Sequence, residues 1–139
     1  MGASRWVYKV AYRPDVPQAL HDLRWEVFRA GDYHRDGDGA PATSPDEALD
    51  RQAEEGTHSI IDMMNGVSPT PEFGTVSPLT EQQLLAVFDT LTPASDRVEA
   101  WLGHGGDNGL RDRWEGLGVV GHTADGVPEF LFFAGVSGD

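Results

Sequence analysis

The sequence predicts a single α+β domain over residues 1–139, in which a mostly antiparallel sheet of about four strands is covered by helices. Three observations support this prediction. The chain opens with a segment of period-two alternation, helical patterns follow in pairs rather than one after each strand, and a hairpin pattern closes the chain. The expected element order is βααβααββ, with no internal repeat and no linker that would divide the domain.

The first strand and the first helix are the clearest elements. Large apolar side chains alternate with polar or small ones over residues 5–13, which is typical of a half-buried strand. Pro14 ends this strand, Asp15 can cap a helix, and Gly31 is a natural helix end. Apolar residues recur at helical spacing between the two signals, so a helix is expected there.

The middle of the chain predicts a helix, a strand and a long loop. Ser44, followed by proline and then by glutamate, begins a helix that should end by Gly56. Residues 57–64 are β-prone and apolar and predict the second strand. Residues 65–78, rich in Pro, Gly and Ser, predict a packed surface loop.

Two more helices are expected before the closing strands. Thr80 caps the first of them, and Thr92-Pro93 separates it from the second. Residues 103–109 form a glycine-rich loop, after which residues 110–114 can add one helical turn.

The end of the chain predicts a hairpin. Strands over about 117–123 and 129–136 flank the turn residues Asp125-Gly126. The last strand is apolar on both faces, so it should be central and covered on both sides. The glycines of a G-x-G-x-x-G pattern, residues 116–121, lie inside a predicted strand with no helix after them, which argues against a dinucleotide-binding turn and favours a bulge or a closely packed helix.

The charge balance bounds the partners. The net charge is −13, with +2 on residues 1–31 and −15 on the remainder. Such a surface repels nucleic-acid phosphate and anionic lipid, so neither a nucleic acid nor a membrane is expected as a partner. The basic face of the first strand (Arg5, Lys9, Arg13) can dock a partner or pair with the domain's own acidic helices.

Composition also removes several mechanisms. The chain contains no cysteine, which excludes disulfides, thiolate nucleophiles and cysteine-ligated metals. It contains neither H-E-x-x-H nor G-x-S-x-G, so the zinc-protease and serine-hydrolase templates fail. No apolar stretch approaches the roughly 20 residues needed to span a bilayer, and the first residues lack an apolar signal region. A cytoplasmic location and no cofactor are therefore expected.

Two functions remain. The leading hypothesis is a small acidic interaction or regulatory protein, an immunity-type protein included, which is not an enzyme and binds a protein partner with a basic surface. It rests on the charge asymmetry and on the lack of a complete catalytic template; a homodimer stays open. The alternative is a small-molecule or metal-binding protein, a hydrolase included, that uses His58 and Asp62 with groups from loops 31–39 and 103–109.

The second predicted strand carries a histidine and a carboxylate on one face. His58 and Asp62 would stand about 13 Å apart at ~3.3 Å per residue, too far to share a ligand directly. Each could meet a group from another strand, for example His122. The competing interpretation is a hydrogen-bonded histidine at a sheet edge. The nearby acidic helix, from Asp46 to Glu55, is interpreted as a solvated face.

Two loops offer further candidate sites. Asp32, Asp36 and Asp38 supply oxygen ligands for a hard cation, although the spacing is not that of an EF-hand. Arg111 and Arg113 follow a glycine-rich loop and could hold a small anion if a helical turn begins near them. The competing interpretations are a solvated polar loop and arginines that pair with neighbouring acidic residues.

Three stretches together resemble a known group of proteins: Tyr12-Arg13-Pro14-Asp15 with the helix after it, Gly56-Thr57-His58-Ser59-Ile60-Ile61-Asp62, and the tail Phe132-Phe133-Ala134-Gly135-Val136-Ser137-Gly138-Asp139. The pattern, which spans most of the chain, is similar to small bacterial proteins of unknown function, mainly actinobacterial. The resemblance implies a natural domain and supplies no catalytic residue.

Overall fold

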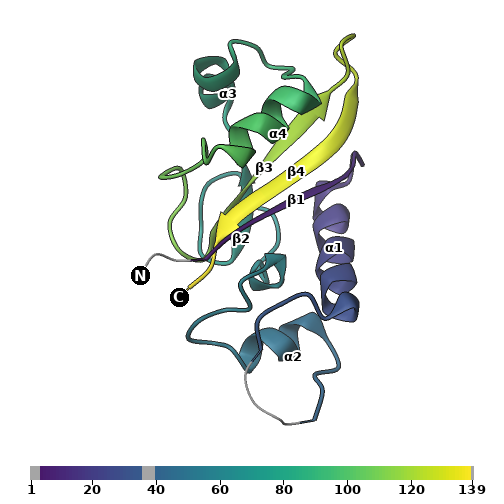
Figure 1. Cartoon of the computed structure of the whole chain (residues 1–139), viewed down its shortest axis with the longest axis vertical. Coiled ribbons are helices and arrows are strands. Elements are labelled where there is room, and N and C mark those ends of the chain that lie inside the picture. Colours follow the sequence, from purple (N-terminus) through teal and green to yellow (C-terminus); the bar gives the residue numbers. More distant parts are fainter. Residues whose placement is uncertain (1–3, 36–39, 139) are drawn as a thin grey trace.

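A computed structural model describes residues 4–35 and 40–138 of the chain (Figure 1). Nine elements follow one another: β1 (Arg5–Ala11), α1 (Val16–Ala30), α2 (Pro45–Asp50), the 3₁₀ turn η1 (Ile60–Asp62), β2 (Thr75–Pro78), α3 (Glu81–Phe88), α4 (Ser95–Gly103), β3 (Glu115–His122) and β4 (Pro128–Val136). The longest described helix, α1, has 15 residues, and none in the described part of the chain is long and apolar enough to cross a membrane.

The four strands form one mixed sheet in the order β1-β4-β3-β2. β4 pairs antiparallel with β1 and with β3, whereas β2 runs parallel to β3. The α+β class and the four-stranded sheet are therefore confirmed, and the sheet is mixed because its edge strand β2 runs parallel to its neighbour. The central position of the last strand is confirmed as well.

The predicted second strand is wrong. Residues 57–64 form a bend and η1, while the second strand, β2, lies in the stretch predicted to be loop. Ser59 accepts a hydrogen bond from the backbone N–H of Ile61 and so caps a tight turn. The left-handed backbone of His58, with φ at 57°, is incompatible with an extended strand.

The two faces of the sheet carry separate apolar cores. Leu131 and Phe133 of β4 point into a core shared with α1, α2 and η1. Phe132 and Ala134 alternate with them and point into a core shared with α3 and α4. In Figure 1, α1 accordingly lies on one side of the sheet and α4 on the other, while the teal-blue α2 lies below the end of the sheet.

Local capping explains most helix starts. Asp15 accepts from the backbone N–H of Gln18, Ser44 accepts from that of Glu47, and Thr80 forms a reciprocal capping box with Gln83. All three predicted caps are confirmed. The expected helical turn at 110–114 is absent, and this segment forms turns instead.

The basic face of the first strand pairs with the chain's own carboxylates. Arg5 forms an ion pair with Asp107. Lys9 lies 3.5 Å from Glu99, and Arg13 lies 2.6 Å from Asp22. Of the two alternatives for this face, the structure shows pairing with acidic residues of the domain itself, two of which lie in helices.

Candidate metal centre

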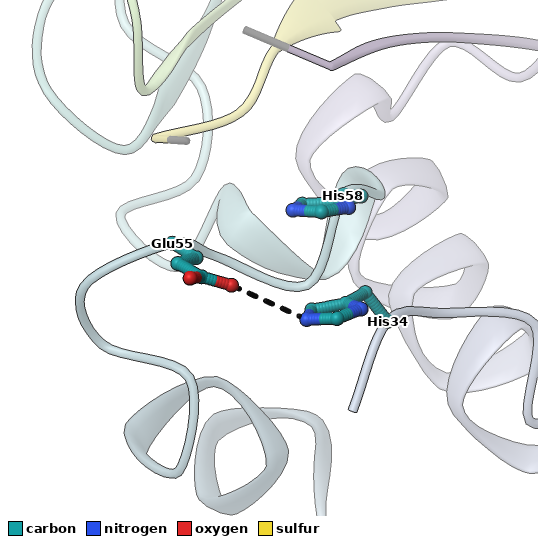
Figure 2. A group of neighbouring side chains, drawn as sticks. All are labelled: His34, Glu55 and His58. Atoms are coloured by element: carbon teal, nitrogen blue, oxygen red, sulfur yellow. Dashed lines mark ion pairs between the residues drawn. The ribbon is translucent and has the colours of Figure 1, made fainter. Parts of the chain in front are cut away.

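Three side chains from different segments converge below the sheet, between η1 and α2. His34 follows α1, Glu55 lies in the turn after α2, and His58 immediately precedes the capping residue of η1. One ligand atom from each lies within 4.8 Å of the other two. Figure 2 shows the two imidazoles lying one over the other, with the Glu55 carboxylate reaching toward them. Two histidine nitrogens and one carboxylate oxygen form a ligand set that suits transition-metal ions.

The backbone brings these segments together. The N–H of His34 donates a 2.7 Å hydrogen bond to the carbonyl of Thr57, which fixes the loop after α1 against the segment that carries His58. Between Glu55 and η1 the chain passes through two left-handed residues, Gly56 with φ at 80° and His58 with φ at 57°. Only glycine fits at position 56, because a Cβ there would lie 2.5 Å from Oδ2 of Asp62.

The left-handed backbone of His58 is itself informative. Such a conformation in a non-glycine residue costs on the order of 1 kcal/mol and is retained where the surroundings enforce it. It places the imidazole against that of His34, with ring centroids 4.4 Å apart and an interplanar angle of 8°. Strained residues cluster at functional sites, so the strain makes His58 a candidate functional residue.

The distances define what a bound ion would require. Nε2 of His34 lies 3.4 Å from Oε2 of Glu55. Two nitrogens that each bind zinc at about 2.1 Å in a tetrahedral site lie about 3.4 Å apart. The ligand atoms, which lie within 4.8 Å of one another, must therefore move closer together around an ion. The near-parallel rings must also tilt, because lone pairs in parallel planes do not converge on one point. Both Glu55 and His34 are partly exposed, which leaves the site open to solvent.

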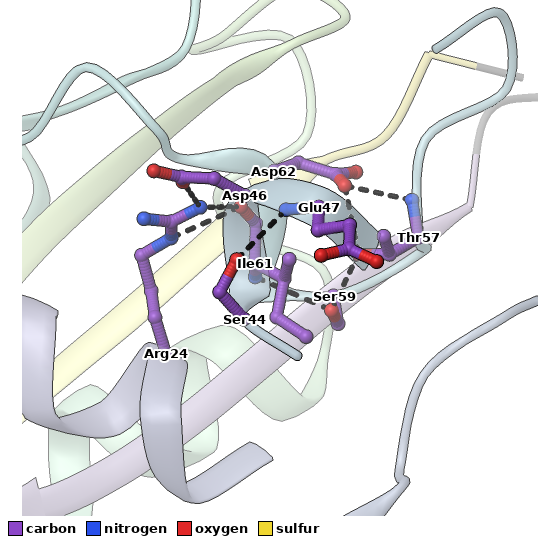
Figure 3. A network of polar contacts seen from close by, with 8 residues as sticks. All are labelled: Arg24, Ser44, Asp46, Glu47, Thr57, Ser59, Ile61 and Asp62. Atoms are coloured by element: carbon purple, nitrogen blue, oxygen red, sulfur yellow. Dashed lines mark hydrogen bonds and ion pairs between the residues drawn. The ribbon is translucent and has the colours of Figure 1, made fainter. Parts of the chain in front are cut away.

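A buried polar network holds Thr57 and Ser59, the residues on either side of His58 (Figure 3). Oδ1 of Asp62 accepts hydrogen bonds from the N–H and the hydroxyl of Thr57, both at 2.7 Å. The Thr57 hydroxyl also lies 2.7 Å from Oγ of Ser59. These contacts hold the two residues that flank His58, so they fix its backbone.

Asp62 is fully buried, and its Oδ2 has no hydrogen-bond partner within the described parts of the chain. Burial raises the pKa of this carboxyl above its ordinary value. Hydrogen bonds from Thr57 and the nearby charges of His58 and Arg24 oppose that rise. Asp62 therefore acts on the histidine segment through Thr57, the residue before His58.

Arg24 ties the network to the helices. Its guanidinium donates to the carbonyl of Ile61 through Nε at 3.0 Å and through Nη2 at 2.6 Å. Nη2 also lies 2.8 Å from the Asp46 carboxylate. One side chain of α1 thereby holds both η1 and α2 in place, which positions the segments on either side of the histidine cluster.

The structure brings together residues that the sequence placed apart. Because the segment is a turn rather than a strand, the expected 13 Å separation of His58 and Asp62 along a strand does not apply. His122 does not join them, since its Nδ1 lies 3.1 Å from the carbonyl of Pro93. The neighbours of His58 are instead His34, from the loop named in the alternative hypothesis, and Glu55. Glu55 was assigned to a helix with a solvated face, but α2 ends at Asp50 and Glu55 lies in the turn after it.

The predicted hard-cation loop is only partly described. Asp32 is exposed, and it does not belong to the His34, Glu55 and His58 group. Asp36 and Asp38 lie outside the described residues. The three-aspartate site therefore stays a prediction.

The two arginines of the predicted anion site differ from each other. Arg111 is buried and donates to the backbone carbonyls of Leu110, Ser77 and Gly116. Burial lowers the pKa of its guanidinium. Arg113 is exposed. An anion site stays a prediction, without the helical turn on which it was based.

One curated protein shares sequence with this chain. Over 113 residues, which make up 81% of the chain, it is 31% identical to a protein of Desulforapulum autotrophicum named "Protease HtpX homolog". These residues cover 36% of that protein, so the chain spans about a third of its relative's length. No family model matches the chain, and no solved structure matches it.

Proposed function

We propose that this chain binds one divalent transition-metal ion of the zinc class through His34, Glu55 and His58. The observation that carries the proposal is the convergence of one ligand atom from each of the three residues within 4.8 Å. Imidazole suits zinc, copper, iron and nickel, and a carboxylate completes the three-residue set found in many catalytic zinc sites. The strained backbone of His58 adds support, because strained residues cluster at functional sites.

Three protein ligands leave a coordination position for water. A zinc-bound water has a pKa of about 7, so it supplies hydroxide as a nucleophile at neutral pH. Hydrolysis is therefore the second candidate function, favoured by the open site and by the word protease in the name of the similar protein. The chain contains no H-E-x-x-H, so such a hydrolase would use a different arrangement of ligands.

Metal titration of the untagged full chain tests the proposal. Isothermal calorimetry and native mass spectrometry with zinc should show one ion per chain with micromolar or tighter affinity, and cobalt should give the visible absorption of an ordered site. His34→Ala, His58→Ala and Glu55→Gln should each weaken binding by about tenfold or more. His104→Ala, which removes an exposed histidine elsewhere, is the matched control and should bind as the parent does.

Two outcomes contradict the proposal. One is the absence of stoichiometric binding of zinc or cobalt to the parent chain. The other is binding that survives both histidine substitutions and is abolished by the combined change of Asp32, Asp36 and Asp38 to Asn. The second result would assign the ion to the loop predicted from the sequence.

The interaction or regulatory role predicted from the charge is a separate proposal, with a cytoplasmic location as part of it. It is favoured by the carboxylates on and after α2, where Asp46, Asp50 and Glu54 are exposed. This role does not exclude a metal ion, since the exposed carboxylates and the histidine cluster involve different side chains.

A further inference from the structure

A groove lies beside α2, on the part of the molecule that also carries the histidine cluster. Its volume is about 420 Å³, and its described walls come from α2 and the turn after it, from the loop before β2, and from Trp114 before β3. The lining residues are Asp46, Leu49, Asp50, Ala53, Met64, Phe73 and Trp114. This volume is within the range of ligand-binding clefts.

Two aromatic rings form one side of the groove. Phe73 and Trp114 have ring centroids 5.3 Å apart with their planes tilted by 37°. Phe73 is 55% exposed, so a ligand can reach its ring. The Trp114 ring packs closely against two glycines. A Cβ added to Gly138 would lie 2.2 Å from the ring, and one added to Gly56 would lie 3.2 Å from it. The groove thus presents a fixed indole beside an accessible phenyl ring.

The charged rim of the groove is acidic. Asp46 and Asp50 line it, and no lysine or arginine is among its described lining residues. Asp46 already pairs with Arg24, while Asp50 is exposed at the end of α2. Aromatic faces beside a carboxylate attract an organic cation through its charge and its apolar stem together.

A second hollow continues from the first. It shares Asp50 and Ala53 with the groove and extends along the turn after α2 past Glu54 and Glu55. Its only described basic residue, Arg51, is engaged by Glu47 and by the carbonyl of Ala40. An open, elongated, acidic surface of this shape fits an extended peptide better than an enclosed small molecule.

We infer that the Phe73–Trp114 groove binds an arginine side chain of a basic segment in a protein partner, with the planar guanidinium over the rings and paired with Asp50. Arginine fits better than lysine because its planar, weakly hydrated cation stacks on aromatic faces. The groove residues Asp50, Phe73 and Trp114 are not ligands of the proposed metal site, although Glu55 lines the second hollow. The inference assigns one ligand, an arginine side chain, to the acidic surface.

The test uses a short, capped peptide with two arginines, titrated into the isotopically labelled full chain and followed by NMR. Binding should shift the Trp114 indole signal and the backbone signals around Phe73 and Asp50, and should weaken as salt is added. A peptide with citrulline in place of both arginines has the same shape without the charge. It should bind at least about two- to fivefold more weakly.

Matched variants test where on the chain the arginine peptide binds. Phe73→Ala and Asp50→Asn should each weaken the arginine peptide by about two- to fivefold. Leu85→Ala removes an equally exposed apolar side chain on α3, and Asp125→Asn makes the same charge change at the β3–β4 hairpin. Both controls should bind the peptide as the parent does. Zinc titrations of all four variants report separately on the metal proposal.

Any one of four results would overturn the inference. They are the absence of shifts at millimolar peptide, equal binding of the citrulline peptide, shifts that lie outside the groove, and an affinity for the arginine peptide that Phe73→Ala leaves unchanged. Free arginine amide is titrated in parallel, and tighter binding of that compound than of the peptide would indicate a small-molecule site instead of a protein-binding one.

Discussion

The two faces of the sheet are built in different ways. On the α3–α4 face the core is apolar, and Phe88 packs edge-on against Trp101 with ring centroids 5.2 Å apart. On the α1 face the long helix α1 is joined by the short α2, the 3₁₀ turn η1 and irregular segments, and the buried groups include Arg24, Thr57 and Asp62. Irregular backbone needs side-chain partners for its polar groups, whereas regular helices supply their own. The face with the irregular cover therefore carries both candidate sites.

The largest expected effect comes from the apolar face. Phe88→Ala removes a side chain that is 2% exposed and should lower the free energy of unfolding by about 3–5 kcal/mol. Urea unfolding followed by circular dichroism measures this loss. Leu85→Ala on the same helix, at a half-exposed position, is the control and should change stability by no more than about 0.5 kcal/mol.

If the two faces are energetically separate, the folded fraction of Phe88→Ala should bind zinc as the parent does. A loss of zinc affinity in that fraction would show that the two faces are coupled through the sheet, which would contradict their energetic separation.

The next effect concerns Arg24. Its replacement by Met leaves the buried carbonyl of Ile61 without its charged donor, which should cost about 1.5–3 kcal/mol of stability. Zinc affinity should fall as well, because η1 and α2 lose their common support. Arg29→Met, at an exposed position on the same helix, should leave zinc binding unchanged. Calorimetric zinc titration and urea unfolding measure the two quantities; full retention of zinc affinity in the Arg24 variant would refute the positioning role.

Asp62→Asn tests the buried carboxylate that holds Thr57, with little change in shape. Because Thr57 precedes His58, the weaker hydrogen bonds should lower zinc affinity by about two- to tenfold. Asp22→Asn, on the exposed side of α1, is the matched control. Equal zinc affinity in the two variants would reduce Asp62 to a purely structural residue.

The smallest effect is a pH dependence on the α1 face. Burial raises the pKa of the Tyr8 phenol above 10.0, with Ile60 and Ser59 as its neighbours. The neutral phenol is favoured in the folded chain, so its stabilisation is complete below pH 10 and is lost as pH rises through the higher folded pKa. Tyrosinate absorbance should show a late step that Tyr8→Phe removes and Tyr12→Phe retains. A late step that survives Tyr8→Phe belongs to another residue.

Locally encoded features were predictable from the sequence. The alternation in β1 and the caps at Asp15, Ser44 and Thr80 depend on residues a few positions apart, and all were predicted correctly. The turn at 57–64 was not, because Ile60 and Ile61 resemble strand residues until Ser59 and the left-handed His58 are seen to reverse the chain.

The candidate metal centre was predictable only in part. His58 and the loop containing His34 were both named from the sequence, but the pairing depends on the contact between the N–H of His34 and the carbonyl of Thr57. Glu55 was missed because a carboxylate in an acidic helix looks solvated until a distant histidine is brought within 3.4 Å of it. Contacts between residues far apart in sequence leave no periodic signal.

The contact between the loop after α1 and the turn before η1 has a consequence for chain entropy. An ion held by His34, Glu55 and His58 would act as a cross-link that closes the stretch between them into a ring. The helix α2 is part of that stretch. Closing such a ring restricts the unfolded ensemble, as a disulfide does. In a chain without cysteine, a coordinated ion would be a reversible substitute for the covalent bridge, and its concentration would set how firmly that ring stays closed.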